Sequence, residues 1–376
     1  MYEFVDIKII CMENIIKLVI FGIILFTQTS CNATGDAGYI GNLDNYISGA
    51  IEISGEPLQS EYIAKNNFRC YWTPDGFLGS MQLQNKKLVH LADLQSGEIK
   101  VSACALGRGP GEILISSPDI DLLNNKLYLL DQRKDEVKRV KIQCDTLITE
   151  DVMKLGLKDP MVFLNLEAVS DSLFLMFVSN FDRIRSIMLL DINNHVLDSL
   201  SYYPLEDKKI NQNSYNFNVN MELTPCHNFL YVSCNQYDCI SKYEINDNRI
   251  HSVKKIFLSE PKYSIKKGRP IFSMDYVSSN CSMYVGAKYI YITMDPESMK
   301  DYNARQRREK QEGIRGSLKP GNDNYILVLD YDLNLVRSYL TDSDISNLAL
   351  TSDPSVVYAT NTRENRLVKY TLPGLN

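Results

Sequence analysis

Histidine, tryptophan and paired cysteines are scarce in this chain of 376 residues, which contains four His, one Trp and nine Cys without a Cys-x-x-Cys pair. The missing pair removes the usual signature of a zinc ribbon or a thioredoxin-like redox centre. Four histidines also leave few candidates for acid–base catalysis. A surplus of positive charge is absent too, because the net charge is −6, and this balance does not favour nucleic acid or an anionic membrane as a partner.

The apolar run at residues 18–26 is nine residues long, too short to cross a bilayer but suited to the core of a signal peptide. Lys17 precedes this run, and Ser30 and Cys31 follow it. A small residue directly before a cysteine resembles the cleavage site of a bacterial lipoprotein. We therefore predict a lipoprotein signal peptide over residues 1–30, with Met12 as an alternative start, and lipidation of Cys31 for an outer-membrane anchor.

Two points about this anchor stay open from the sequence. Gln28 stands where an aliphatic residue is usual, so an ordinary cleaved signal with an incidental cysteine is the alternative. No acidic run follows Cys31, and the periplasmic or surface side of the outer membrane is undecided.

A six-residue strand pattern, aliphatic at its start and apolar at its end, recurs six times along the chain. Its copies are residues 89–94, 137–142, 187–192, 240–245, 326–331 and 367–372. Further short strand patterns, rich in the 23 tyrosines, lie before and after most copies, with turn residues between them. Repeats of this period predict an all-β fold, a six-bladed β-propeller of four-stranded antiparallel blades. The expected inner strand of blade five lies around residues 271–277.

The ends of the repeat array predict how the ring is completed. The sixth repeat has no outer strand after it, and residues 46–54 read as a strand without a blade. Because an open sheet edge leaves backbone groups unpaired, we expect this N-terminal strand to be the outer strand of blade six. Residues 31–45 then form a tether, residues 46–376 form the propeller, and residues 295–321 form an insertion in blade five with a polar helix over 296–312.

The loop at residues 107–112 reads GRGPGE. A phosphate-binding loop would need a following Lys-Ser/Thr or a helix, so a tight turn between blades is the simpler interpretation. With the lipoprotein-like start and the six repeats, this loop makes the chain resemble the TolB-like six-bladed propeller lipoproteins of Gram-negative envelopes. The resemblance implies a six-bladed propeller and an envelope lipoprotein, and it implies no established catalytic residues.

Three connections share one face of the predicted propeller, because strand direction alternates within a blade. They are the 107–112 loop and segments 259–270 and 295–321, of which the last two carry net charges of +3 and +2. This face predicts a protein or anionic glycan partner, or else a solvated surface whose charges are locally paired. The candidate binding residues are Arg108, Glu112, Lys266, Lys267, Arg269, Arg305, Arg307 and Arg308.

A non-enzymatic binding or scaffold lipoprotein is therefore the expected function, without a cofactor. The alternative is a calcium-dependent, lactonase-like hydrolase, since the predicted inner strands offer oxygen ligands. The candidate calcium ligands are Asp119, Glu167, Asn218 and Asp275, and further polar residues of these strands are Asp121, Asn165, Asn220 and Glu222. His90, His195, His227 and His251 all lie away from the inner strands and the long-loop face, which speaks against a Ser-His-Asp or Cys-His site there.

Cys234 and Cys239 flank a predicted hairpin loop. They could form a disulfide in an oxidising envelope, or be small buried hydrophobic residues. The spacing alone leaves both possibilities open.

Overall fold

A computed structural model shows the arrangement of most of residues 38–375, which belong to one unit of the chain. It describes residues 38–39, 43–58, 69–73, 76–84, 87–93, 98–109, 111–114, 119–143, 146–156, 161–180, 184–214, 217–234, 236–278, 281–311, 323–361, 364 and 366–375. The predicted signal peptide and Cys31 lie outside these residues and stay predictions. No helix in the described part is long and apolar enough to cross a bilayer.

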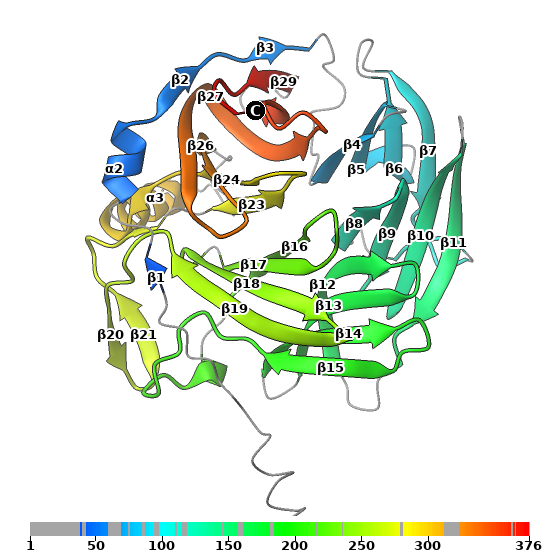
Figure 1. Cartoon of the computed structure of the whole chain (residues 1–376), viewed down its shortest axis with the longest axis horizontal. Coiled ribbons are helices and arrows are strands. Elements are labelled where there is room, and N and C mark those ends of the chain that lie inside the picture. The colour runs from blue at the N-terminus through cyan, green and yellow to red at the C-terminus, as the bar shows by residue number, and fades with distance from the viewer. Residues whose placement is uncertain are drawn as a thin grey trace, which may run out of the picture. The chain divides into compact units, whose positions relative to one another are not determined.

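Four-stranded antiparallel sheets are arranged around a central axis (Figure 1). The first four are consecutive in sequence, and each begins with its inner strand. Blade one contains β4 (Arg69–Thr73), β5 (Gly76–Gln84), β6 (Lys87–Ala92) and β7 (Ile99–Ala105), and blade two contains β8 (Asp119–Leu123), β9 (Lys126–Asp131), β10 (Glu136–Gln143) and β11 (Thr146–Lys154). Blade three contains β12 (Met161–Ser170), β13 (Leu173–Asn180), β14 (Arg185–Asp191) and β15 (Val196–Ser201), and blade four contains β16 (Val219–Leu223), β17 (Phe229–Cys234), β18 (Cys239–Asn246) and β19 (Arg249–Phe257).

Blades five and six share one long strand, β27 (Leu335–Leu350). Its first part is the outer strand of blade five, beside β26 (Asp323–Leu329), and its last part is the inner strand of blade six, beside β28 (Val356–Asn361). The other strands are β23 (Ser282–Val285) and β24 (Ile290–Met294) in blade five, and β29 (Arg366–Thr371) in blade six. The predicted all-β propeller of six blades is thus confirmed.

Buried tyrosines of the second strands connect neighbouring blades. Tyr128 donates its hydroxyl hydrogen bond to Asp171 of the next blade, and Tyr231 and Tyr291 donate to backbone carbonyls of the next blade, each at 2.6 Å. A buried phenol needs such an acceptor. At the junction of blades six and one, Trp72 stacks on Tyr358 with ring centroids 5.3 Å apart.

The predicted position of the completing N-terminal strand is wrong. Within residues 46–54, only β2 (Ile51–Ile53) is a strand, and it pairs in parallel with β27 at the end of blade five. The outer position beside β29 is taken by β3 (Glu56–Pro57), which pairs with Val368 and Lys369. The difference arises because α2 (Leu43–Ser48) precedes β2, and Ile53 turns into the core shared with Tyr339 and Tyr370.

Two further parts of the prediction differ in detail. The predicted tether includes β1 (Gly38–Tyr39), which pairs in parallel with β19. The inner strand of blade five was expected around residues 271–277 but is β23, because residues 263–272 form a separate hairpin of β20 (Tyr263–Lys266) and β21 (Arg269–Phe272). A short 3-10 helix, Gln212–Ser214, lies between β15 and β16.

Candidate functional site: an axial cavity and a cationic projection

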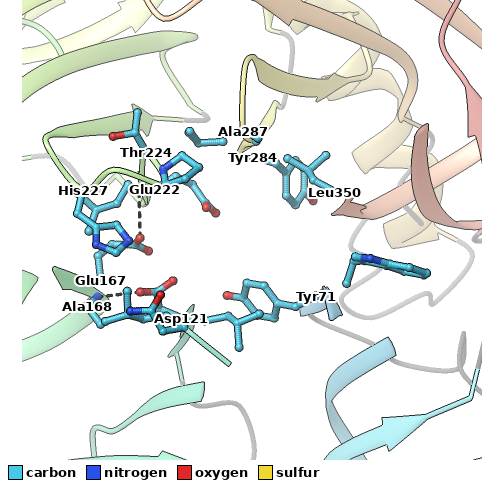
Figure 2. A pocket seen from close by; sticks show the side chains of 18 of the residues that line it. Tyr71, Asp121, Glu167, Ala168, Glu222, Thr224, His227, Tyr284, Ala287 and Leu350 are labelled. Carbon is cyan, nitrogen blue, oxygen red and sulfur yellow. Dashed lines mark hydrogen bonds between the residues drawn. The ribbon is translucent and has the colours of Figure 1, made fainter. Parts of the chain in front are cut away.

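A cavity of about 320 Å³ lies on the propeller axis, and all six blades contribute to its lining. The residues come from the ends of the inner strands and from the turns that follow them (Figure 2). They are Tyr71, Trp72, Asp121, Leu122, Leu123, Asn124, Glu167, Ala168, Glu222, Leu223, Thr224, Pro225, His227, Tyr284, Val285, Gly286, Ala287, Leu348, Leu350 and Thr351.

Three carboxylates from consecutive blades form one wall of this cavity: Asp121 on β8, Glu167 on β12 and Glu222 on β16. In the antiparallel register, each lies opposite the third residue of the second strand of its own blade. Asp121 accepts a hydrogen bond from the backbone N–H of Ala168 at 2.8 Å, and Glu167 accepts one from Leu223 N–H at 3.1 Å. These bonds join blade two to three and blade three to four, and they hold both carboxylates in place.

Aromatic and aliphatic side chains from blades five, six and one form the opposite wall. It contains Tyr284, Leu348, Leu350, Tyr71 and Trp72. Figure 2 shows Asp121, Glu167 and Glu222 on one side and Tyr284, Leu350 and Tyr71 on the other. The Tyr71 hydroxyl donates to the carbonyl of Ile120 at 2.9 Å, so this wall is also tied to the neighbouring blade.

The candidate calcium ligands are not brought together by the fold. Of the four, Glu167 lines the cavity, whereas Asn218 and Asp275 are exposed and do not. Asp275 lies in a turn after β21, where Ser273 and Lys262 lower the pKa of its carboxyl. The backbone of Asp119 begins β8, and its side chain is outside the described part. Within the described residues, no group of three or more His, Cys, Asp or Glu side chains is placed to hold a metal ion.

Sequence reasoning missed the aromatic half of this site and the position of His227. The histidine was set aside because it lies in a turn after an inner strand, yet the cavity lies at that end of the strands. The antiparallel register supplies a signal for Tyr71. It lies opposite the third residue of β5, just as Asp121, Glu167 and Glu222 lie opposite the third residue of the second strand in blades two to four.

A second feature, which we call the cationic projection, comprises residues 260–278 and 297–311. The β20–β21 hairpin turns at Lys267 and Gly268, both with positive φ, and the Gly268 carbonyl accepts a hydrogen bond from Asn211 N–H at 2.8 Å. Helix α3 (Met299–Gln311) follows β25 (Glu297–Ser298), which pairs with β22 (Val277–Ser278). Lys300 N–H donates to the Met274 carbonyl at 3.0 Å, so helix and hairpin are joined at their bases.

Most of the predicted binding cations lie on this projection. Lys266, Lys267 and Arg269 are exposed at the hairpin tip, and Arg307 and Arg308 are exposed on α3. None of these five forms an ion pair with another described residue. Arg305 is on the same helix, but its side chain is outside the described part.

The other two candidate residues lie in the loop between blades one and two. Arg108 is exposed, whereas Glu112 faces its own loop and accepts a hydrogen bond from Gly109 N–H at 2.7 Å. Lys134 donates to the Glu112 carbonyl at 2.8 Å, and Gly111 has a φ of 69°. The loop is thus a tight turn held by Glu112 from within and by Lys134 from the neighbouring turn, in agreement with the simpler interpretation of its sequence.

The fold and cavity define the chain as a six-bladed β-propeller with an axial cavity. A family model described as TolB-like 6-blade propeller-like matches residues 61–353, and the chain belongs to this family. No curated protein matches the sequence.

Several solved structures are similar in fold. A candidate exported protein from Bacteroides fragilis is 11% identical, with 89% of this chain and 97% of that chain covered and a TM-score of 0.51. The calcium-binding protein regucalcin from Agrobacterium tumefaciens is 10% identical, with 87% and 96% covered and a TM-score of 0.46. BamB from Moraxella catarrhalis is 8% identical, with 85% and 99% covered and a TM-score of 0.41. Identities this low show a shared fold alone.

Proposed function

We propose that this protein is an envelope-anchored lipoprotein that acts as a non-enzymatic binding or scaffold propeller. Its partner is an anionic protein or glycan held on the cationic projection. The observation that supports this most is the hairpin tip, where Lys266, Lys267 and Arg269 are exposed on a turn fixed to the body by Asn211. The predicted signal peptide and Cys31 support the anchoring.

Contacts at the base of the hairpin hold in place the turn that carries the cations. Phe272 stacks on Tyr276 with ring centroids 4.6 Å apart, and Tyr276 donates its hydroxyl hydrogen bond to the buried Asp238 at 2.9 Å. A rigid element loses little conformational entropy when it binds, so more of the electrostatic attraction appears as affinity. Clustered cations also speed the approach of an anionic partner.

The proposal is tested by binding to two defined probes, polygalacturonate and polyglutamate, at low and high salt. Replacing Lys266, Lys267 and Arg269 by Gln should weaken binding to the preferred probe on the order of tenfold, since each exposed charge contact contributes less than about 1 kcal/mol. The wild-type affinity should also fall as salt rises.

The matched control removes three exposed cations from elsewhere, with Arg133, Lys154 and Lys288 replaced by Gln. This control has the same net charge as the test variant and should bind like the wild type. Equal weakening in both variants would show a response to net charge only and would overturn the assignment to the projection. Cross-linking in native envelopes, with the same pair of variants, then identifies the natural partner.

A further inference from the structure

The two unlike walls of the axial cavity restrict what it can hold. Blades two to four supply Asp121, Glu167 and Glu222, and blades five, six and one supply mainly aromatic and aliphatic side chains (Figure 2). A cavity of about 320 Å³ is at the lower end of the range for small-molecule sites. Its occupant is therefore a small molecule or a single side chain.

The acidic wall is organised before any ligand arrives. Backbone N–H groups of the next blade bind Asp121 and Glu167, and Glu167 is only 2% exposed. The inner strands that carry these residues are fixed by their sheets. Carboxylates held in this way need no reorganisation on binding, which favours affinity and selectivity.

Several ligand classes match the cavity poorly. An anion would meet three carboxylates and, among the described lining residues, no lysine or arginine. A metal ion needs several converging ligands, and no such group occurs in the described part of the chain. A wholly apolar molecule would displace water from the acidic wall and offer no polar group in its place, at a cost in free energy.

We propose that the axial cavity binds a small organic cation, an amine with an apolar or aromatic body. Its ammonium group contacts the wall formed by Asp121, Glu167 and Glu222, and its body packs against Tyr284, Leu350 and Trp72. Charge-assisted hydrogen bonds to carboxylates and contact with aromatic faces both favour this orientation. The site is separate from the cationic projection, and the two proposals stand or fall independently.

Trp72 provides a direct reporter of occupancy, because it lines the cavity and is the one tryptophan of the sequence. Its ring is held by stacking on Tyr358. A ligand that packs against it changes its surroundings, and hence its fluorescence, without any label.

The test titrates the full mature protein with phenethylamine, phenylethanol, methylamine, calcium and a short peptide with a single lysine. Phenethylamine should produce a saturable change in Trp72 fluorescence. Phenylethanol, which lacks the ammonium group, and methylamine, which lacks the aromatic body, should each bind at least about tenfold more weakly. Tighter binding of the peptide than of phenethylamine would assign a lysine side chain as the occupant, and the reverse would assign a free amine.

Glu222→Gln should weaken phenethylamine binding on the order of tenfold. Glu98→Gln is the matched control, because Glu98 is an exposed carboxylate outside the cavity lining. Circular dichroism confirms that both variants fold. Equal affinity for phenethylamine and phenylethanol, a saturable response to calcium alone, or no saturable response to any amine would each overturn the proposal.

Discussion

Burial changes the chemistry of several cysteine and tyrosine side chains in this propeller. Desolvation by burial raises the pKa of Cys104 and of Cys239 to about 11, and it raises the pKa of Tyr128 and Tyr370 to about 12. Cys234 and Cys239 are opposite each other across a strand pair, and both are free, buried thiols in the structure. The interpretation of these cysteines as small buried residues therefore agrees with their positions.

Stability should fall in alkaline solution because of these buried thiols and phenols. An unfolded thiol has a pKa near 9.0 and an unfolded phenol near 10.0, whereas the folded groups stay protonated to about 11 and about 12. Between these values the unfolded chain releases protons that the folded chain retains, so rising pH favours unfolding. Urea unfolding should show a constant midpoint from neutral pH to about pH 9 and a decreasing midpoint above it. A midpoint that rises or stays flat above pH 10 would contradict this assignment.

At the scale of elements, the N-terminal segment matters more than its short strands suggest. Ile53 is 8% exposed and belongs to the core of blades five and six, and Leu43 of α2 is buried against blades four and five. The segment thus covers apolar surface as well as pairing with β27 and β29. Edge pairing and core burial contribute together.

A chain that begins at residue 60 should be much less stable than one that begins at residue 40. The shorter chain lacks α2, β2 and β3, and the loss of Ile53 alone costs about 2 kcal/mol of apolar burial. Thermal melting of the two truncated proteins measures the difference.

Two substitutions within β2 provide the control for this truncation. Ile53→Ala should lower the free energy of unfolding by about 2 to 4 kcal/mol, whereas Glu52→Ala, at an exposed position, should change it by less than about 0.5 kcal/mol. Equal melting temperatures for the two truncated proteins would refute a stabilising role of the segment.

At the scale of the whole molecule, two charged features, the axial cavity and the cationic projection, lie at opposite ends of the blades. The cavity lies towards the turns between first and second strands, and the cationic projection arises from the connections at the other end. A large anionic partner on the projection would therefore leave the cavity accessible. One chain with a net charge of −6 can thus present a local positive surface and a local acidic site.

Anchoring determines where both features are displayed. If Cys31 is lipidated, metabolic labelling with a palmitate analogue should mark the wild-type protein, and Cys31→Ser should lose the label and move to the soluble fraction. Cys226→Ser is the matched control, since Cys226 is an exposed cysteine of the propeller, and it should keep both label and membrane location. Label retained in Cys31→Ser would exclude this cysteine as the lipid site.

The sequence by itself determined the strand repeats, the number of blades, the polar helix of the insertion and the tight turn at Gly111. These features are local, because period-two strands, turn residues and helix limits depend on neighbours in the chain. Tertiary structure decided what depends on contacts distant in sequence. Ile53 rather than the whole of residues 46–54 enters the core. The inner strand of blade five is β23 and not residues 271–277. Across the axis, the carboxylates Asp121, Glu167 and Glu222 face Tyr284 and Trp72. Six blades must close around that axis before residues more than a hundred positions apart line one cavity, and no local pattern specifies which of them face it.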